Sequence, residues 1–293
     1  MVKLFLAGFE SRLSNIYTDL LKKNCKAGIV VSYLNMEKKG KSLEKFIEKL
    51  SALKKRGIPI MIDSGAHGLL YAYKKKKGIT IEFGHKISKK AEAILENSGY
   101  ENYFNEYIEF TANYQDIFDI IVELDIQEIV GKEIYKYRKK FHKVGIKPMY
   151  VWHGEDKEEV TSWIKSTDYI GIGGTEGDSS IFRKIKVAKI IKSINPNIKI
   201  HLFAETGRNI VKYSRWIDSA DSSTWCFGGR KGLIYLYNKG VIKVLSKKSF
   251  YKHYGKVFDW RSYRIDRWNL LQWLKFADYL ERINYEDRKN KCR

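Results

Sequence analysis

Acidic side chains and one histidine follow short apolar runs at several points of the sequence. Asp63 ends the run IPIMID, Asp125 ends IFDIIVELD, and His153 ends KPMYVWH. The stretch WIDSADSSTW adds Asp218 and Asp221, where a buried strand would ordinarily carry Val, Ile or Leu. Two carboxylates that face one reaction centre can perform glycosyl transfer, because one attacks the anomeric carbon while the other moves the proton.

Each of these residues also has an ordinary structural explanation. Asp125 could cap a following helix, Asp63 could shape a turn, and Glu205 could pair with a nearby arginine. A histidine such as His153 is, taken alone, more often a hydrogen-bonded core residue. Their joint occurrence favours a site, because clustered carboxylates repel one another and are retained mainly where they do chemistry or bind a polar ligand.

Two other chemistries fit the sequence less well. No HxH pair or cluster of two histidines accompanies the acids, so metal-assisted hydrolysis is not favoured. The glycine-rich stretch 171–177, GIGGTEG, lacks the Lys-Ser/Thr ending of a phosphate-binding loop. Its glycines are instead suited to the close approach of a flat ligand. Neither metal-assisted hydrolysis nor phosphate-loop chemistry is therefore expected.

Eight short apolar runs alternate with segments of helical period and must position these side chains. The runs span residues 3–9, 28–34, 58–65, 117–125, 147–154, 168–174, 198–207 and 217–225. Helical periodicity is clearest over 42–57, 158–166 and 179–195. This order predicts an α/β fold, a (β/α)8 TIM barrel, in which catalytic groups lie at the carboxyl ends of the strands. Asp218, about 10 Å deeper along its strand than Asp221, is expected to be structural or to orient its neighbours.

Three further segments complete the predicted architecture. An unusually long segment after the third strand, residues 66–116, should sit over the mouth of the barrel. Residues 232–245 read as a hairpin, and 259–283 read as one or two amphipathic helices. We expect a single domain over 1–293, with the barrel core at about 1–232 and an extension at about 233–293.

The composition indicates a polyanionic partner. Lys and Arg number 55 against 34 Asp and Glu, which gives a net charge of +21. Codon bias in an AT-rich genome would explain part of this excess. No apolar run approaches the roughly 20 residues of a membrane span, and the N-terminus reads as a strand rather than an export signal. The three cysteines are far apart, which predicts a reducing, cytoplasmic location.

Five short motifs occur in the order and at the strand ends seen in tRNA-guanine transglycosylases. They are IDSG (62–65), VELD (122–125), WHG (152–154), GIGG (171–174) and IDSADSSTW (217–225). The sequence most resembles the DNA-acting relatives of these enzymes, the DpdA-like DNA-guanine transglycosylases of phages and bacterial DNA-modification clusters. The resemblance implies exchange of guanine in DNA for a 7-deazaguanine base such as preQ0, through a covalent aspartyl-glycosyl intermediate and without a cofactor.

The resemblance also implies roles for individual residues. Asp221 would be the nucleophile that attacks C1′, and Asp63 the general acid and base. Asp125 would read the N1 and N2 edge of the base, and His153 would contact O6, where the tRNA enzymes carry a glutamine. The remaining members of the expected base-binding set are Ser64, Gly173 and Gly174.

Cationic and aromatic residues near the predicted mouth are expected to hold the nucleic acid, although a lysine run is more often a solvated face. The candidates are Arg208, Arg215, Arg230 and Lys231, the lysine run 74–77, and Trp225 or Phe227 as a stacking wedge.

One departure from the tRNA enzymes bears on the choice of partner. The cysteines of their zinc site are missing here, which makes a structural zinc unexpected and favours DNA over tRNA. A tRNA-acting enzyme, a non-catalytic nucleic-acid-binding subunit and a simple glycoside hydrolase stay open as alternatives.

Overall fold

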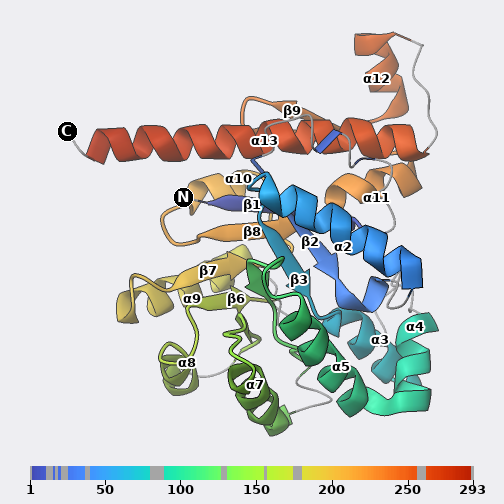
Figure 1. The fold of residues 1–293 in the computed structure, drawn as a ribbon. Helices are drawn as coiled ribbons and strands as arrows, with labels where there is room; N and C mark the ends of the chain where they lie inside the picture. Colours follow the sequence, from blue (N-terminus) through green and yellow to red (C-terminus); the bar gives the residue numbers. More distant parts are fainter. Residues whose placement is uncertain are drawn as a thin grey trace.

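The protein is a parallel barrel surrounded by helices (Figure 1). The computed structural model describes residues 2–10, 16, 19–20, 26–36, 40–79, 89–126, 131–154, 157–173, 180–255 and 262–291. Eight strands form one parallel sheet in the order β4-β3-β2-β1-β8-β7-β6-β5. They are β1 (Lys3–Ala7), β2 (Gly28–Ser32), β3 (Ile60–Asp63), β4 (Ile120–Ile121), β5 (Tyr150–Trp152), β6 (Tyr169–Ile172), β7 (Lys199–Leu202) and β8 (Ser219–Ser222).

The two edge strands of this order meet, so the sheet closes. Val122 and Met149 form a parallel bridge between the ends of β4 and β5. Met149 N donates to Ile121 O at 2.8 Å, and Glu123 N donates to Met149 O at 3.1 Å. Each of the eight predicted runs contains one strand, and the predicted (β/α)8 barrel is confirmed.

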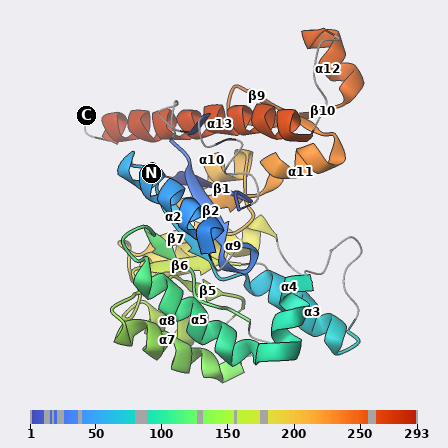
Figure 2. The ribbon, with the colours of Figure 1, turned by 45° about the vertical axis from the view of Figure 1, so that its right-hand side comes forward.

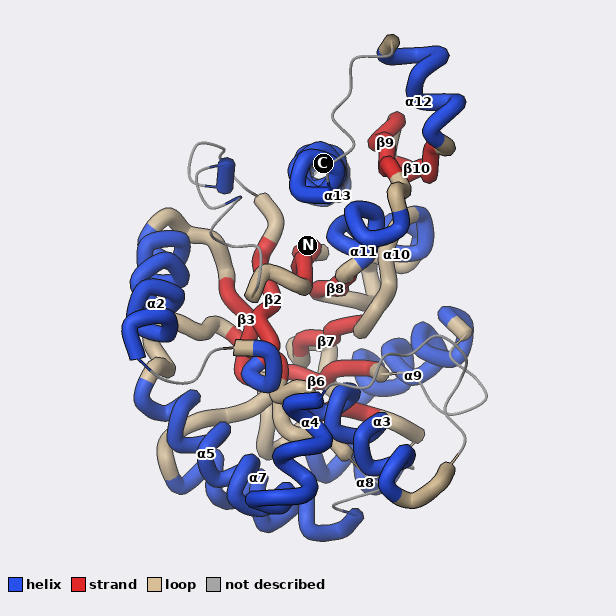
Figure 3. The backbone as a smooth tube through the Cα atoms, turned by 90° about the vertical axis from the view of Figure 1, so that its right-hand side faces the viewer, coloured by secondary structure: helices blue, strands red, loops and turns tan. Residues whose placement is uncertain are grey.

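The helices lie outside the barrel, most of them as its outer layer and α12 apart from it (Figure 3). They are α2 (Gly40–Lys55), α3 (Ala66–Lys76), α4 (Lys89–Ala93) with a π-helical turn (Ile94–Ser98), α5 (Gly99–Asn113), α7 (Ile134–Lys143), α8 (Lys157–Trp163), α9 (Ile181–Ile194), α10 (Arg208–Lys212), α11 (Thr224–Lys231), α12 (Lys247–Tyr254) and α13 (Ser262–Lys291), with 3-10 turns at Tyr33–Asn35 and Gly131–Glu133. None of the described helices has a stretch long and apolar enough to cross a lipid bilayer.

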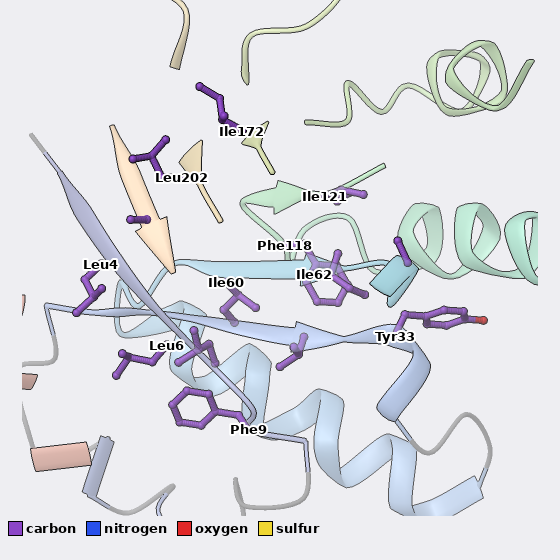
Figure 4. Close-up of a cluster of buried hydrophobic side chains, with 14 of the residues drawn as sticks. Leu4, Leu6, Phe9, Tyr33, Ile60, Ile62, Phe118, Ile121, Ile172 and Leu202 are labelled. Carbon is purple, nitrogen blue, oxygen red and sulfur yellow. The ribbon is translucent and has the colours of Figure 1, made fainter. Parts of the chain in front are cut away.

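Alternation along the strands decides which side chains enter the barrel. Leu4, Leu6 and Ile60 belong to the larger core between the strands and the helices (Figure 4). Phe5 and Met61, one residue along, belong to the separate cluster inside the barrel. Since successive side chains point to opposite faces of a strand, the residue two after Met61 also faces inward at the rim. That residue is Asp63.

The long segment between β3 and β4 is only partly an insertion. Its last helix, α5, lies beside α7 in the outer layer, where a barrel helix belongs (Figure 3). The hydroxyl of Tyr103 donates to Ser64 O at 2.5 Å, and that of Tyr107 donates to Val122 O at 2.7 Å. The expectation that the whole segment covers the mouth is therefore wrong for α5, whose tyrosines fix the ends of β3 and β4.

The C-terminal part of the chain packs on the side of the barrel formed by β1. The predicted hairpin is confirmed as the antiparallel pair β9 (Ile234–Asn238) and β10 (Val241–Leu245). One long helix, α13, follows it and contacts α11, β9 and β1. Figure 2 shows α13 on the opposite side of the molecule from α7 and α8.

A buried ion pair joins the end of β4 to the outer layer. Glu123 accepts two hydrogen bonds from the guanidinium of Arg138, at 2.6 and 2.7 Å, and a third from Val151 N at 2.7 Å. The carboxylate is 1% exposed and the guanidinium 6%. The guanidinium also lies 3.9 Å from the ring centre of Tyr150 and 4.2 Å from that of Trp163. Glu123 is thus a structural residue, although it stands beside Asp125 in the sequence.

Replacing Glu123 by Gln should strongly destabilise the fold, because the charge of Arg138 would stay buried without its counterion. We expect a loss of about 3–5 kcal/mol in the free energy of unfolding, measured by urea denaturation. The matched control is Glu101→Gln, since Glu101 forms an exposed pair with Lys136 at 3.3 Å. Such a pair contributes less than about 1 kcal/mol. Equal losses in the two variants would contradict this account.

Candidate active site

Three of the predicted acids meet at the carboxyl ends of the strands. Asp63 is the last residue of β3, Asp221 lies in β8, and Asp125 follows β4. Asp125, Asp221 and also Glu10 act electrostatically on Asp63. Glu10, which follows β1, was not predicted; its carboxylate accepts a hydrogen bond from the backbone N–H of Ser32. Its position just past the first apolar run was the signal that could have found it.

Asp63 is the member of this group whose charge is most disfavoured. Burial raises its pKa from 3.8 to about 7, and the charge of Asp125 adds to the effect, as do those of Asp221 and Glu10. A hydrogen bond from Gly65 N to Asp63 Oδ2, at 3.0 Å, acts in the opposite direction. Near neutral pH a large fraction of Asp63 is therefore protonated and able to donate a proton.

Asp221 is surrounded by donors instead. Its Oδ1 accepts a hydrogen bond from Ala204 N at 2.8 Å and another from Nε2 of His201 at 3.3 Å. Ala204 has φ of 57°, a left-handed conformation that non-glycine residues adopt at some energetic cost and that is often found at functional sites. The two aspartates thus have environments suited to different roles.

Asp125 and His153 form one hydrogen-bonded pair. Asp125 Oδ2 lies 2.5 Å from His153 Nε2, and the two side chains are 14% and 26% exposed. Gly173 permits this arrangement, because a Cβ there would lie 2.8 Å from Cε1 of the histidine. The structure therefore places these three predicted base-binding residues together, while Gly174 lies outside the described residues.

Ser64 does not fit its expected role. The residue is fully buried, and its carbonyl oxygen accepts the hydrogen bond from Tyr103. Its Oγ has no hydrogen-bond partner among the described residues. The following residue, Gly65, has φ of 84°, and a Cβ there would lie 2.3 Å from Leu34 Cβ. The prediction that Ser64 contacts a base is corrected, because the packing around this turn leaves it no accessible surface.

Two of the predicted nucleic-acid contacts are wrong. Trp225 is fully buried, its ring packs 5.0 Å from that of Phe9, and its Nε1 donates to Ala7 O at 2.8 Å. Arg215 precedes β8 and stacks on Trp216, so it lies at the opposite end of that strand from Asp221. The ring of Trp225 therefore faces the core, and the side chain of Arg215 lies away from the rim.

The structure describes the side chains of only some of the other cationic candidates. Lys231 is exposed, with its Nζ 5.3 Å from the ring centre of Phe227, which is itself 43% exposed. Arg208 and Arg230 lie in α10 and α11, but their side chains are outside the described set. In the lysine run, Lys75 pairs with Glu92 at 2.6 Å on the protein itself.

An exposed aromatic residue at the rim was not predicted from the sequence. Phe182, in the first turn of α9, is 70% exposed. Its neighbour Arg183 lies 5.6 Å from the ring centre of Trp152, the last residue of β5, which fixes this turn near the carboxyl ends of the strands. The alternation of apolar and basic residues in IFRKIKVAK gave no sign that this Phe faces solvent.

Two remaining acids have structural partners. Asp218 Oδ2 accepts hydrogen bonds from Lys192 Nζ at 2.8 Å and from Ile200 N at 2.9 Å, which confirms its expected structural role. Glu205 pairs with the buried Lys184 at 3.4 Å. Within the described ranges, no three His, Cys, Asp or Glu side chains are grouped so that they could hold a metal ion.

Comparison with known proteins supports the fold and no particular activity. No family model matches the sequence, and no curated protein matches it. A putative fructose-1,6-biphosphate aldolase from Coccidioides immitis shares the fold with a TM-score of 0.54, at 9% identity over 95% of this chain and 88% of that one. A mutant tryptophan synthase alpha-subunit from Pyrococcus furiosus matches with a TM-score of 0.48, at 13% identity over 79% of this chain and 91% of that one. The aldolase likeness and the closed sheet of eight parallel strands show that the chain is a TIM-barrel protein.

Asp63 should make the stability of the protein depend on pH in a definite direction. Its pKa is raised on folding, so the stability that its protonated form contributes is present below about pH 4 and is lost as the pH rises through about 7. Asp63→Asn removes this titration. The variant should therefore gain stability relative to wild type between these pH values, by roughly 1–3 kcal/mol once solvent screening is included.

Thermal unfolding of the two proteins at several pH values measures the difference. The control is Asp168→Asn, because Asp168 is 81% exposed and precedes β6, at the other end of the barrel. A difference between Asp63→Asn and wild type that stays constant from pH 4 to 8 would contradict the raised pKa.

Proposed function

We propose that the protein is a base-exchanging transglycosylase that replaces guanine in DNA by a 7-deazaguanine derivative. The observation that carries this proposal is the pair of aspartates at one rim with unlike environments. Asp63 has a pKa near 7, whereas Asp221 accepts two hydrogen bonds on one oxygen. Two carboxyl groups in such unlike environments are suited to act as acid and nucleophile.

The proposed reaction has two displacement steps at C1′ of the target nucleotide. In the first, an oxygen of Asp221 attacks C1′ while Asp63 gives its proton to the departing guanine, which leaves a covalent ester between Asp221 and the sugar. In the second, the incoming base loses a proton to the carboxylate of Asp63 and its nitrogen attacks C1′, which releases Asp221. One N-glycosidic bond replaces another, so the balance requires no cofactor.

The Asp125–His153 pair is the proposed reader of the base. A carboxylate can accept two N–H donors, such as N1–H and N2–H of guanine, while a histidine whose Nε2 faces a carboxylate can donate to a carbonyl oxygen when it also carries a proton on Nδ1. Asp125 and His153 are both partly exposed, and Gly173 brings backbone close to the histidine ring. This chemistry supports a purine that presents both donors and a carbonyl on one edge.

The choice of DNA rests on charge and on the exposed aromatic residues at the rim. A net charge of +21 favours a polyanion. C1′ of a paired nucleotide is shielded, so the target would be extruded or single-stranded, and exposed rings stabilise unstacked bases. Phe182 and Phe227 are the described aromatic residues placed for this role, and Lys231 adds a cation beside the second ring.

The other candidate functions are weakened by specific observations. A non-catalytic binding subunit would not require the unfavourable burial of Asp63 among other acids. A glycoside hydrolase acting on a neutral sugar polymer would not require the large positive charge. The same exchange on tRNA uses the same two aspartates, so the polymer must be decided by experiment.

Base exchange is tested by incubating the protein with plasmid DNA or bulk tRNA, each with radiolabelled guanine. We expect label in DNA from the wild type. Asp221→Ala should lose the activity by roughly 10⁴-fold or more and form no covalent DNA adduct, because the nucleophile is gone. Asp168→Ala, on the opposite face, should behave as wild type. An adduct that still forms with Asp221→Ala would refute the assigned nucleophile, and label only in tRNA would refute the choice of DNA.

Phe182 should contribute to binding of single-stranded DNA. Removal of one stacking ring costs roughly 1–3 kcal/mol, so Phe182→Ala should weaken the affinity for an oligonucleotide by about 5- to 150-fold. The measurement is a fluorescence anisotropy titration at fixed salt. The control is Val244→Ala, because Val244 is 57% exposed on β10, in the C-terminal hairpin. An unchanged affinity of the Phe182 variant would contradict a rim-bound strand.

A further inference from the structure

A chain of hydrogen bonds runs through the barrel interior to Asp221. The hydroxyl of Tyr169 in β6 lies 2.6 Å from Ser219 Oγ in β8. Ser219 Oγ in turn lies 2.6 Å from His201 Nδ1 in β7, and His201 Nε2 lies 3.3 Å from Asp221 Oδ1. His201 and Ser219 are fully buried, and the imidazole packs edge-on against the ring of Phe203 at 4.6 Å. The two middle members of the chain are therefore enclosed by protein.

The carboxylate at its end sets the direction of the whole chain. A carboxylate only accepts hydrogen bonds, so Nε2 of His201 must carry a proton. In a neutral imidazole Nδ1 is then the acceptor, and it accepts from the Ser219 hydroxyl. Ser219 Oγ is left to accept from Tyr169, which stays a donor because burial raises its pKa above the usual value. Three donors in series point toward Asp221.

The same carboxylate oxygen is held from a second side. Ala204, whose backbone is in the left-handed conformation, donates its N–H to Oδ1 at 2.8 Å. The described residues make two hydrogen bonds to the Asp221 carboxylate, and both are accepted by Oδ1. Oδ1 is thus anchored, while Oδ2 accepts no hydrogen bond from the described residues. The side chain is 16% exposed at the rim, so the unanchored oxygen is the one able to approach a substrate carbon.

We propose that His201 is a positioning residue that orients Asp221 for attack through Oδ2. His201 acts through Asp221 and does not itself reach the sugar. The Asp221 carboxylate sets the tautomer of His201, while Ser219 and Tyr169 hold the orientation of its ring from the other side. This inference rests on the proposed function, since it assigns His201 a role in the step that forms the covalent intermediate.

Single-turnover formation of the DNA adduct is the first test. His201→Leu removes the donor to Asp221 and should slow the adduct-forming step by roughly 10- to 100-fold, while the affinity for DNA stays within twofold of wild type. His201→Gln keeps an N–H donor, now an amide, on a side chain of similar length. On a logarithmic scale, it should recover at least half of the rate of adduct formation that is lost in His201→Leu. Tyr169→Phe removes only the donor farthest from Asp221 and should slow the step by less than His201→Leu. An unchanged rate in His201→Leu, or a loss of DNA affinity equal to the loss of rate, would overturn the proposal.

The tautomer of His201 in the protein without DNA is the second test. A ¹⁵N–¹H correlation spectrum of the imidazoles should show His201 protonated at Nε2 and unprotonated at Nδ1, and Asp221→Ala should shift this signal. Protonation at Nδ1 alone, or at both nitrogens at neutral pH, would overturn the proposed direction of the chain. Because this measurement needs no turnover, it separates the two failures. A wild type that labels neither polymer contradicts the proposed function, whereas a wrong tautomer contradicts the role of His201 alone.

Discussion

The crowding of carboxyl groups at one end of the barrel is the constraint on which the rest of this structure depends. Asp63 is buried among the charges of Asp125, Asp221 and Glu10, and its pKa rises to about 7 as a result. Placing acids together costs folding free energy, which a protein tolerates when the cluster does chemistry. The surrounding structure provides hydrogen-bond donors to the other acids: the backbone N–H of Ser32 for Glu10, and His153 for Asp125. The donors to Asp221 are His201 and Ala204 N.

The scaffold keeps this arrangement rigid by fixing strand ends from outside. Tyr103 and Tyr107 of α5 donate to carbonyl oxygens at the ends of β3 and β4. The buried Glu123–Arg138 pair ties the same region to α7 and, through Val151 N, to β5. Removal of either partner would leave a charge in the interior, so this pair constrains the register of three elements at once. The site thus lies on rigid elements, and the acids cannot relax apart.

The sequence predicted the barrel and the central acids because both follow from local pattern. Eight apolar runs with helical segments between them define the order of strands, and residues at strand ends such as Asp63 and Asp221 then share a rim. Predictions failed where the answer depended on tertiary packing. Trp225 follows Asp221 closely, yet the short helix α11 turns its ring into the core against Phe9. Arg215 is near Asp221 in sequence but lies before the strand that carries it.

His201 shows what the sequence could not reveal. A lone histidine in the middle of an apolar run reads as a core residue, and burial agrees with that interpretation. Its importance comes from partners in β6 and β8, Tyr169 and Ser219, whose pairing across strands follows only from the register of the closed sheet. A role as a core residue and a role in positioning Asp221 are compatible here, because a buried histidine is a rigid support for the partly exposed carboxylate.

The central claim is that Asp221 becomes covalently attached to the sugar of a target nucleotide. The most direct measurement is to denature the protein during reaction with a guanine-containing oligonucleotide, digest the trapped adduct, and locate the modified residue by mass spectrometry. The account predicts a nucleoside-derived mass on the peptide that carries Asp221, and none on the peptide that carries Asp63. The same modification on Asp63, or a complete turnover without any modified peptide, would contradict it.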